Sequence, residues 1–334
     1  MGREPLAWSE IVELGRGFMP ARIVLTAVEL DLFTVLEQRG PLGPVELGRA
    51  LGASERGTVA LAEALVALGL LERTAQGAFA ATEPARRTLS RHSPHWRAAP
   101  LLHLGALWRS WSELTEVVRT GRPPAREPER KEQLAFQLAM HHLKLDRAEA
   151  IARALPLGGS KRVLDLGGGA GTIAAALLRL DPAVEVTLYD LHLALDVAKK
   201  LWPREWIEAG RLRLKAGDML QDLLPAGFDL VLLSDVIHMF EPVEVRRLFA
   251  RVRDSVVGGG LIAVRDFFLD EDRSGPVAAA VFAVNMLVAT PAGRVYTRGE
   301  VGQWLEQAGF TAPEERAAEG DAEHRILLAR KPAA

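Results

Sequence analysis

The stretch Val163-Leu164-Asp165-Leu166-Gly167-Gly168-Gly169-Ala170-Gly171-Thr172 sets the fold expected for this chain. Apolar residues flank an acid, and a run of glycines then opens an apolar segment, residues 173–180, that is typical of a helix. A second apolar strand, residues 184–189, ends on Asp190. This order predicts the first strand–helix–strand step of a nucleotide-binding sheet, in which glycines let the backbone approach a ligand and the acid binds ribose hydroxyls.

The spacing of the glycines separates two candidate cofactors. A dinucleotide fingerprint requires a third glycine at position 172, where this chain has Thr172. The pattern Gly167-x-Gly169-x-Gly171 instead matches the one that binds S-adenosylmethionine (SAM). We therefore expect SAM rather than NAD, with Gly167, Gly169 and Asp190 as cofactor-binding residues.

Composition bounds the possible functions. The chain has 334 residues, enough for two domains, and its 49% apolar and 25% charged residues are ordinary for a globular protein. A net charge of −2 gives no general attraction to nucleic acid or to an anionic membrane. The absence of cysteine excludes disulfides and cysteine–zinc sites, and we expect no metal site. Neither a signal-peptide core nor an apolar run of roughly 20 residues is found, so we expect a cytoplasmic protein without a membrane partner.

Residues 1–99 have the pattern of a winged-helix domain. Apolar periodicity predicts helices over 23–36, 45–51 and 54–68, and a small hairpin follows over 70–81. This fold often binds DNA, but the segment holds eleven arginines, no lysine and eleven acidic residues, and so lacks the basic balance of a DNA reader. We therefore predict a dimerisation domain and no nucleic-acid partner.

Residues 100–155 are expected to form linking helices. A helix over 100–122 carries an apolar stripe that a partner subunit or the catalytic domain is expected to bury, and we predict a homodimer. A proline-rich linker over 122–128 and a helix over 131–155 follow. The stripe consists of Leu101, Leu104, Leu107, Trp108, Trp111 and Leu114.

Residues 156–334 alternate strands with helices, which predicts an α/β domain whose parallel sheet is covered on both faces. Helices are expected over 276–289 and 298–308, and the last two strands are expected to be antiparallel, giving a mixed seven-stranded sheet. The strands are expected at 162–166, 184–189, 211–215, 228–234, 260–267, 311–316 and 323–330, with Gly258-Gly259-Gly260 ending the last crossover.

Two further positions follow the ends of strands, at the edge where open α/β sheets bind ligands. Asp218 can accept the adenine amino group while Met219 packs on the ring, or Asp218 can cap a helix N-terminus. His238 follows the strand that ends near Ser234. A neutral imidazole there can take a proton from a substrate hydroxyl, but a lone histidine can also be structural, and both interpretations are kept.

Taken together, the chain resembles the SAM-dependent O-methyltransferases of plants and bacteria that methylate small aromatic natural products. The resemblance covers residues 10–330 and implies a winged-helix dimerisation domain, a linking helix and a Rossmann-like methyltransferase domain. It implies that Gly167, Asp190, Asp218 and Met219 contact SAM and that His238 is the catalytic base. It rests on VLDLGGGAGT, Tyr189-Asp190, Gly217-Asp218-Met219, FDLVLLSDVIH, Gly258-Gly259-Gly260 and the segment from Asn285-Met286-Leu287 to Ala308-Gly309-Phe310.

Three positions depart from the family's usual pattern. Met239-Phe240 stand where the family usually has Asp-Trp, and Val295 stands near a position that is often acidic. A basic residue that often touches the cofactor is replaced by Ser234, which we keep as a cofactor-binding candidate. Without a carboxylate partner the tautomer and orientation of His238 are less firmly set, so the residue is expected either to be a weak base or only to bind substrate.

The acceptor pocket is expected between the edge of the sheet and the helices over 131–155 and 276–289. Methionine and phenylalanine suit a flat apolar acceptor, although helix periodicity also places such residues in an ordinary core. The candidate wall residues are Phe136, Met140, His141, Phe282, Asn285 and Met286.

Three functions remain at this point. The first is methyl transfer from SAM to a hydroxyl of an aromatic or polyketide-like natural product in secondary metabolism. The second keeps the fold and makes the chain a SAM-dependent C-methyltransferase, decarboxylase or hydroxylase, as the altered His-Met-Phe triplet suggests. The third is a SAM-binding DNA regulator, against which the balanced charge of residues 1–99 argues.

Overall fold

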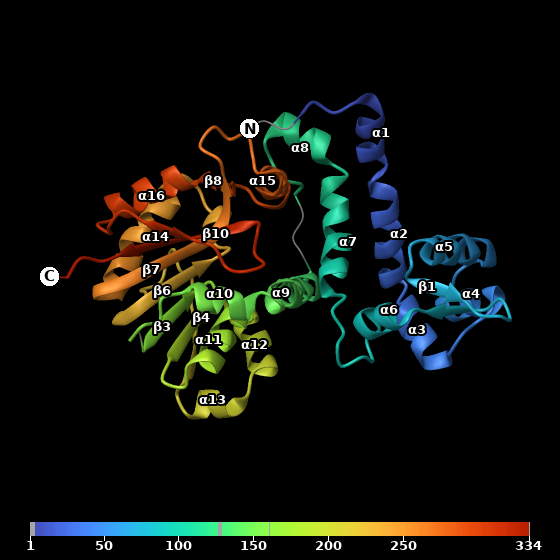
Figure 1. Cartoon of the computed structure of the whole chain (residues 1–334), viewed down its shortest axis with the longest axis horizontal. Coiled ribbons are helices and arrows are strands. Elements are labelled where there is room, and N and C mark those ends of the chain that lie inside the picture. The colour runs from blue at the N-terminus through green and yellow to red at the C-terminus, as the bar shows by residue number, and fades with distance from the viewer. Residues whose placement is uncertain (1–3, 126–128, 160, 334) are drawn as a thin grey trace. The chain divides into compact units, whose positions relative to one another are not determined.

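The computed structural model describes residues 4–125, 129–159 and 161–333, and part of the predicted linker, residues 126–128, lies outside them. The chain divides into two compact units, of which one ends at Arg109 and the other begins at Ser110 (Figure 1). The boundary falls within helix α7 (Ala99–Trp111). Among the described residues, no helix has both the length and the apolar character needed to cross a membrane.

The first unit is helical with one small hairpin, as the sequence predicts. Its core gathers apolar residues from the helices α2 to α5 and from the hairpin, including Leu32, Phe33, Leu47, Leu65 and Phe79. Ser54 caps α5 by accepting a hydrogen bond from Gly57 N–H. The elements are α1 (Trp8–Arg16), α2 (Phe18–Glu29), α3 (Leu32–Arg39), α4 (Pro44–Leu51), α5 (Glu55–Ala67), β1 (Leu71–Arg73), β2 (Phe79–Ala81) and α6 (Glu83–Leu89).

The second unit is built on a mixed sheet whose strands run in the order β5-β4-β3-β6-β7-β10-β9, with the short β8 beside β7. The strands from β5 to β7 are parallel and β10 is antiparallel to β7 and β9. The Rossmann-like fold is thereby confirmed. The strands are β3 (Arg162–Leu166), β4 (Glu185–Asp190), β5 (Leu212–Ala216), β6 (Phe228–Ser234), β7 (Val256–Leu269), β8 (Tyr296–Thr297), β9 (Glu314–Arg316) and β10 (His324–Arg330).

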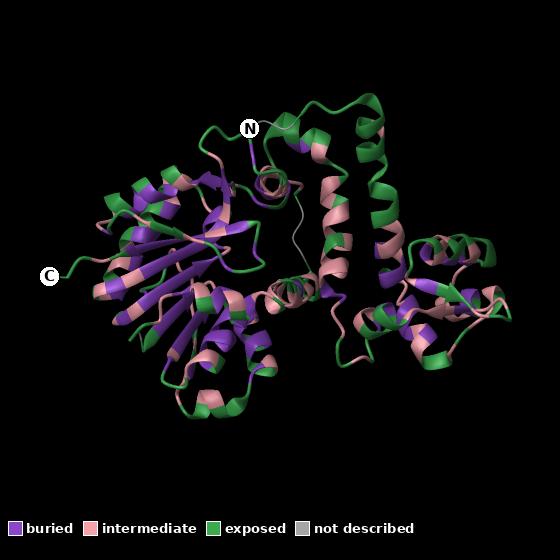
Figure 2. Ribbon diagram, in the orientation of Figure 1, coloured by how far each residue is buried: buried purple, intermediate pink, exposed green. Residues whose placement is uncertain are grey.

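Helices cover both faces of this sheet, and Figure 2 shows its central strands as buried. Alternate residues of β3 enter opposite cores: Val163 packs with α10 and α11, whereas Leu164 packs with α14 and α16. The helices are α8 (Leu114–Thr120), α9 (Arg130–Leu145), α10 (Ala148–Ala154), α11 (Thr172–Leu180), α12 (His192–Leu201), α13 (Arg204–Glu208), η1 (Ile237–Met239), α14 (Pro242–Ser255), α15 (Val277–Ala289) and α16 (Arg298–Gln307).

Three predicted helices are in fact broken. The helix expected over 23–36 is interrupted at Leu30 and Asp31, between α2 and α3. The helix expected over 100–122 ends at Trp111, and α8 begins at Leu114. The helix expected over 131–155 ends at Leu145, and α10 begins at Ala148. At the break between α9 and α10 the packing partners change. Helix α10 shares a core with α11, whereas α9 contacts the start of α11 and the residue that follows β6.

The three glycines at 258–260 do not end the crossover as predicted but lie inside β7. Gly259 has φ +79, and a Cβ on Gly260 would lie 2.9 Å from the Asp229 carbonyl oxygen. The pairing of β6 with β7 shifts register at this point, between Phe228 and Leu230. The glycines therefore form an irregularity that lets β7 begin earlier than expected.

Candidate active site

The glycine loop after β3 is held by Asp190, the last residue of β4. The Asp190 carboxylate accepts hydrogen bonds from Gly169 N–H and from the N–H of Leu191, each at 2.7 Å. Gly167 has φ +74, and a Cβ there would lie within 2.8 Å of the side chains of Val236 and Met219. A side chain at Gly167 is therefore excluded by backbone conformation and by space. Burial raises the pKa of Asp190, and the two N–H groups oppose that rise.

Asp165 supports the same loop from inside the sheet, and sequence reasoning did not single it out as a site residue. Its carboxyl is 1% exposed, and a Cβ on Gly168 would lie 2.5 Å from its Oδ2 atom. Among the described residues, Oδ1 has no hydrogen-bond partner. Burial raises the pKa of Asp165 to about 7, although the charge of Lys144 opposes that rise. A neutral carboxyl thus fits beneath a loop that must approach a ligand.

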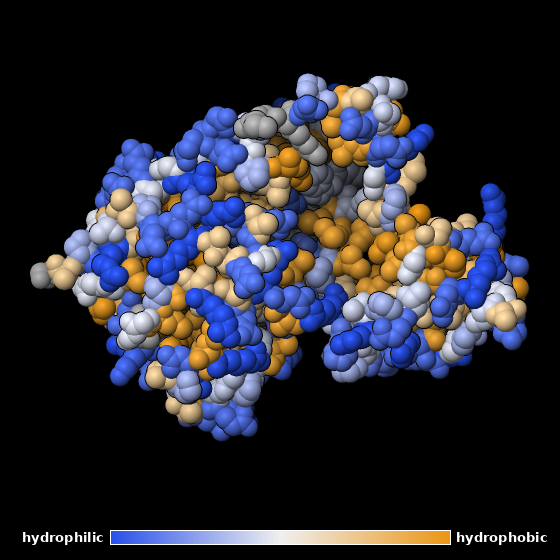
Figure 3. All heavy atoms as spheres, in the orientation of Figure 1, coloured by the Kyte–Doolittle hydropathy of each residue, from blue (hydrophilic) through white to orange (hydrophobic). Residues whose placement is uncertain are grey.

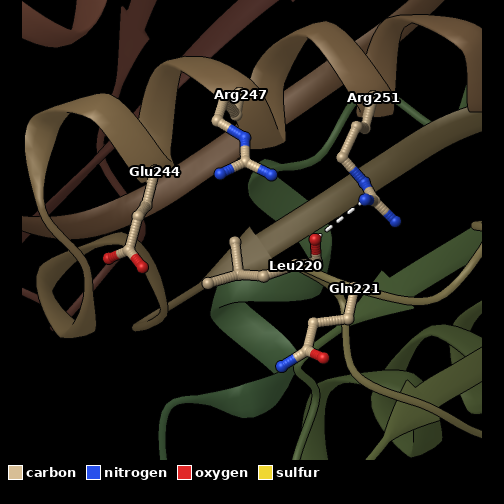
Figure 4. A pocket seen from close by; sticks show the side chains of 5 residues that line it. All are labelled: Leu220, Gln221, Glu244, Arg247 and Arg251. Atoms are coloured by element: carbon tan, nitrogen blue, oxygen red, sulfur yellow. Dashed lines mark hydrogen bonds between the residues drawn. The ribbon is translucent and has the colours of Figure 1, made fainter.

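The loop after β5 carries Asp218 and Met219. No helix begins at Asp218; its Oδ1 atom accepts a hydrogen bond from Leu220 N–H at 2.8 Å and closes a turn. Arg251 on α14 donates from Nη1 to the Leu220 carbonyl at 2.8 Å and braces this turn from outside (Figure 4). The small cavity beside it, about 220 Å³, contains none of the predicted site residues. Its lining consists of Leu220, Gln221, Glu244, Arg247 and Arg251.

His238 lies in η1 and has a carboxylate partner. Its Nδ1 atom is 2.7 Å from Oδ1 of Asp266 on β7, and the two side chains are 8% and 1% exposed. Asp266 Oδ1 also accepts the backbone N–H of Phe267 at 2.8 Å. Because a carboxylate is an acceptor, we assign the imidazole proton to Nδ1, which leaves Nε2 as the free basic atom.

This pairing corrects the expectation that His238 lacks a carboxylate partner. In the family pattern the acidic partner of the histidine is expected at position 239 or near Val295. Here the acid comes instead from β7, the strand adjacent to β6. Asp266 was missed because it lies within a strand that reads as buried core. The sequence feature that could have identified Asp266 is its place near the end of a predicted strand, because such ends line the ligand-binding edge of an open α/β sheet.

Of the predicted acceptor wall, the structure brings Phe282 next to His238. The two rings meet edge to face with centroids 4.8 Å apart, and the ring of Phe267 stacks with that of Phe282 at a centroid distance of 4.2 Å. Asn285 accepts a hydrogen bond from Trp111 Nε1 at 3.1 Å. Met286, by contrast, is 5% exposed and belongs to the core.

The residues predicted from α9 do not all face the acceptor side. Phe136 is exposed and Met140 is half-buried. His141 is buried; its Nδ1 atom lies 2.9 Å from Thr172 Oγ1 at the start of α11, and its ring meets Trp202 edge to face. His141 therefore contacts the start of α11, and its place in the acceptor wall stays a prediction.

A buried group of charges surrounds Asp235, the residue after β6. Arg265 on β7 is 2% exposed and donates to Asp235 at 2.6 Å and to Asp321 at 2.9 and 2.5 Å. His324 on β10 contacts the same two carboxylates, and Lys144 on α9 lies 2.9 Å from Asp235. Burial alone would raise the pKa of Asp235, but Lys144, Arg265 and His324 hold it well below its usual range.

Ser234, predicted to contact the cofactor, is 2% exposed and belongs to this group. Its hydroxyl oxygen lies 3.2 Å from Arg265 Nη1 and donates to Asp235 Oδ2 at 3.2 Å. The side chain is thus directed into the protein.

The glycine loop, Asp190 and Asp218 together suit an adenosine cofactor. Three strand ends, those of β3, β4 and β5, carry them along one edge of the sheet. Gly217 keeps this edge compact, because a Cβ there would lie 2.0 Å from the Tyr189 hydroxyl oxygen. Among the described residues, no group of three or more metal-ligating side chains is present.

Comparison with known proteins gives the same assignment. The O-methyltransferase domain matches residues 111–311, and the O-methyltransferase dimerisation domain matches residues 12–91. The chain is 31% identical to the tetracenomycin polyketide synthesis 8-O-methyl transferase of Streptomyces glaucescens, over 97% of this chain and 96% of that protein. It is 32% identical to acetylserotonin O-methyltransferase of Gallus gallus, over 92% and 93%.

Among solved structures, human N-acetylserotonin methyltransferase in complex with SAM superposes with a TM-score of 0.85 at 28% identity, covering 100% of both chains. The expected fold, cofactor and class of enzyme are confirmed by these matches. The chain belongs to the family of SAM-dependent O-methyltransferases that carry an N-terminal dimerisation domain.

Proposed function

We propose that this enzyme transfers the methyl group of SAM to a hydroxyl of a small aromatic or polyketide-like compound, with His238 as the general base. The observation that carries the proposal is the buried pair formed by His238 Nδ1 and Asp266 Oδ1 at 2.7 Å, beside the ring of Phe282. The acceptor class is supported by the two relatives described above, whose names specify a polyketide and acetylserotonin.

The chain's own residues have three tasks in this reaction. Bound SAM supplies a sulfonium that is already a strong methyl donor. We propose that Asp190 holds the ribose of SAM and that the backbone at Gly167 and Gly169 packs against the cofactor. Asp218 and Met219 are proposed to hold the adenine. Fixing donor and acceptor in line supplies several kcal/mol of barrier lowering, because translational and rotational freedom is lost on binding rather than during reaction.

The second task is proton removal. A phenolic hydroxyl, with a pKa of about 10, is mostly un-ionised at neutral pH, so a base that accepts its proton raises the rate roughly 10²–10⁴-fold. His238 Nε2 is the atom for this step, because Nδ1 is engaged by Asp266. The carboxylate of Asp266 holds the ring and stabilises the imidazolium that forms.

The third task is to shape an apolar site. Phe282 and Phe267 are half-buried and stacked with ring centroids 4.2 Å apart, which provides flat surface next to the base. A planar aromatic acceptor gains from packing on such rings. Asn285 is proposed to orient a polar substituent through the amide group that its bond to Trp111 holds in place.

The test is methyl transfer from labelled SAM to a panel of phenols, naphthols and polyketide-like quinones. We expect product with at least one hydroxylated ring and none with the matched methyl ethers. His238→Ala should lower kcat about 10²-fold or more and leave the affinity for S-adenosylhomocysteine nearly unchanged. Transfer to carbon instead of oxygen, or a fully active His238→Ala enzyme, would reject this function.

We further propose that the enzyme is a homodimer joined through its N-terminal unit. Helices α1 and α2 present large apolar side chains to solvent, and Figure 3 shows hydrophobic surface over α2 and α7. Trp8 is 78% exposed and Leu14 is 74% exposed, and clustered apolar side chains of this size are unusual on the surface of a monomeric protein. Light scattering at micromolar concentration should give twice the chain mass, and Trp8→Asp with Leu14→Asp should give the monomer.

A further inference from the structure

Lys144, on helix α9, places a positive charge at the end of strand β6. The side chain of Ser234, the last residue of β6, is directed into the protein. The ammonium of Lys144 reaches the next residue along, with Nζ 2.9 Å from Asp235 Oδ2. A cation from α9 therefore lies at this strand end, although none is present in the strand itself.

The position of Lys144 on α9 places it over the cofactor edge. Residues 137, 141 and 144 lie on one face of the helix, at the spacing of successive turns. Gln137 Oε1 lies 3.4 Å from where a Cβ on Gly169 would be, and His141 contacts Thr172 at 2.9 Å. The same helix face thus follows the glycine loop, the start of α11 and the end of β6.

The charge of Lys144 is also felt at the other strand ends. It opposes the rise in pKa that burial causes at Asp165 in β3 and at Asp190 at the end of β4. The ammonium thus interacts with carboxylates on or directly after three strands that are neighbours in the sheet, β4, β3 and β6.

Lys144 is less enclosed than Arg265 and His324 and keeps donors that its ion pair does not use. Arg265 is 2% exposed and is held by Asp235 and Asp321, and both ring nitrogens of His324 contact the same carboxylates. The side chain of Lys144 is 20% exposed. An ammonium has three donors, and the ion pair with Asp235 accounts for one.

The group holds more basic side chains than carboxylates within ion-pair distance of one another. Its cations are Lys144, Arg147, Arg265 and His324, whose pKa is raised by its two carboxylate partners against the effect of burial. Its anions are Asp235, Asp321 and Glu323. The four basic side chains thus share three carboxylates within ion-pair distance.

We propose that Lys144 binds the carboxylate of the methionyl part of SAM. The proposal rests on the cofactor site described above and assigns one of its ligands. The alternative is that Lys144 only anchors α9 to Asp235, in which case no ligand group depends on its charge.

The test compares two ligands that differ only by the carboxylate. S-adenosylhomocysteine has it, and S-adenosyl-3-thiopropylamine keeps the adenosine, thioether and amine but lacks it. Calorimetric affinities are measured for both ligands with the wild-type chain, Lys144→Gln, Lys144→Arg and the control Lys199→Gln. Lys199 is a 58% exposed lysine on α12 that pairs with Asp196.

We expect Lys144→Gln to weaken S-adenosylhomocysteine about tenfold or more while the decarboxylated ligand binds as before or more tightly. Lys144→Arg should restore most of the loss, and Lys199→Gln should change neither affinity. An equal loss for both ligands, or no loss for either, would overturn the proposal and leave Lys144 as an anchor of α9.

A measurement on the wild-type chain alone tests the proposal even if the Lys144→Gln variant does not fold. The wild-type chain must prefer S-adenosylhomocysteine to the decarboxylated ligand by at least tenfold, and a smaller preference overturns the proposal. If the proposed cofactor site itself were wrong, the wild-type chain would bind neither ligand, and this result differs from every outcome given above for Lys144.

Discussion

Replacing Asp266 by asparagine tests the central pair of the proposed mechanism. The substitution keeps the size and shape of a fully buried side chain and removes its charge. Asp266 Oδ1 accepts two N–H groups, His238 Nδ1–H at 2.7 Å and Phe267 N–H at 2.8 Å. The oxygen of the new amide should therefore stay at this position, because its NH₂ group there would face two donors.

The expected magnitude follows from this geometry. A hydrogen bond to a charged group is worth about 1.5–3 kcal/mol and a neutral one about 0.5–1.5 kcal/mol, so the loss is on the order of 1.5 kcal/mol, or tenfold. Burial of the pair increases the effect, and we expect kcat to fall about 10- to 100-fold. The fall should be smaller than the roughly 10⁴-fold of a serine-protease triad, where the asparagine selects the wrong tautomer.

The assay is the initial rate of labelled methyl transfer to a phenolic acceptor, with kcat and KM separated, beside calorimetry with S-adenosylhomocysteine. The control is Asp196→Asn, an exposed acid on α12. The affinity for S-adenosylhomocysteine should stay within about twofold, because Asp266 lies on the acceptor side. A kcat within threefold of wild type, or a parallel loss of cofactor affinity, would show that the pair does not serve proton transfer.

Three further outcomes are expected. Asp190→Ala should weaken SAM binding by about 1.5–3 kcal/mol in calorimetry, since the ribose hydroxyls lose a charged acceptor and Gly169 N–H loses its partner; unchanged affinity would remove Asp190 from the site. The raised pKa of Asp165, about 7 against 3.8, means that the folded state keeps a proton that the unfolded state loses, so this contribution to stability is complete below pH 4 and is lost as pH rises to 7. The loss is about 4 kcal/mol over this whole range and about 3 kcal/mol between pH 5 and pH 8, so urea unfolding at these two pH values should show a difference that is smaller by about 3 kcal/mol for Asp165→Asn than for wild type; equal differences would contradict the assignment. Gly217→Ala places a Cβ 2.0 Å from the Tyr189 hydroxyl and should lower the free energy of unfolding by about 1–3 kcal/mol, and an unchanged melting temperature would show that the loop moves aside freely.

Local patterns in the sequence determined most of the elements and the positions proposed to bind the cofactor. The glycine spacing from Gly167 to Gly171, the acid that ends β4 and the Gly217-Asp218-Met219 turn are contiguous with the strands that carry them. Such features follow from backbone conformation and short-range geometry, which the residues within a few positions of one another set by themselves. Asp190 therefore lies where its place after a strand predicted.

Contacts between distant segments were decided only by the tertiary structure. Asp266 is 28 residues from His238, and the two meet because β6 and β7 are neighbours in the sheet. His141 contacts Thr172 and Trp202, 31 and 61 residues away along the chain, because α9 packs beside α11 and α12. Arg265 reads as an interruption in an apolar strand, and only the convergence of Asp235 and Asp321 compensates its charge. Periodicity states which residues share a face of an element, but the partner of that face depends on strand order and on the direction of the helices, which no local pattern encodes.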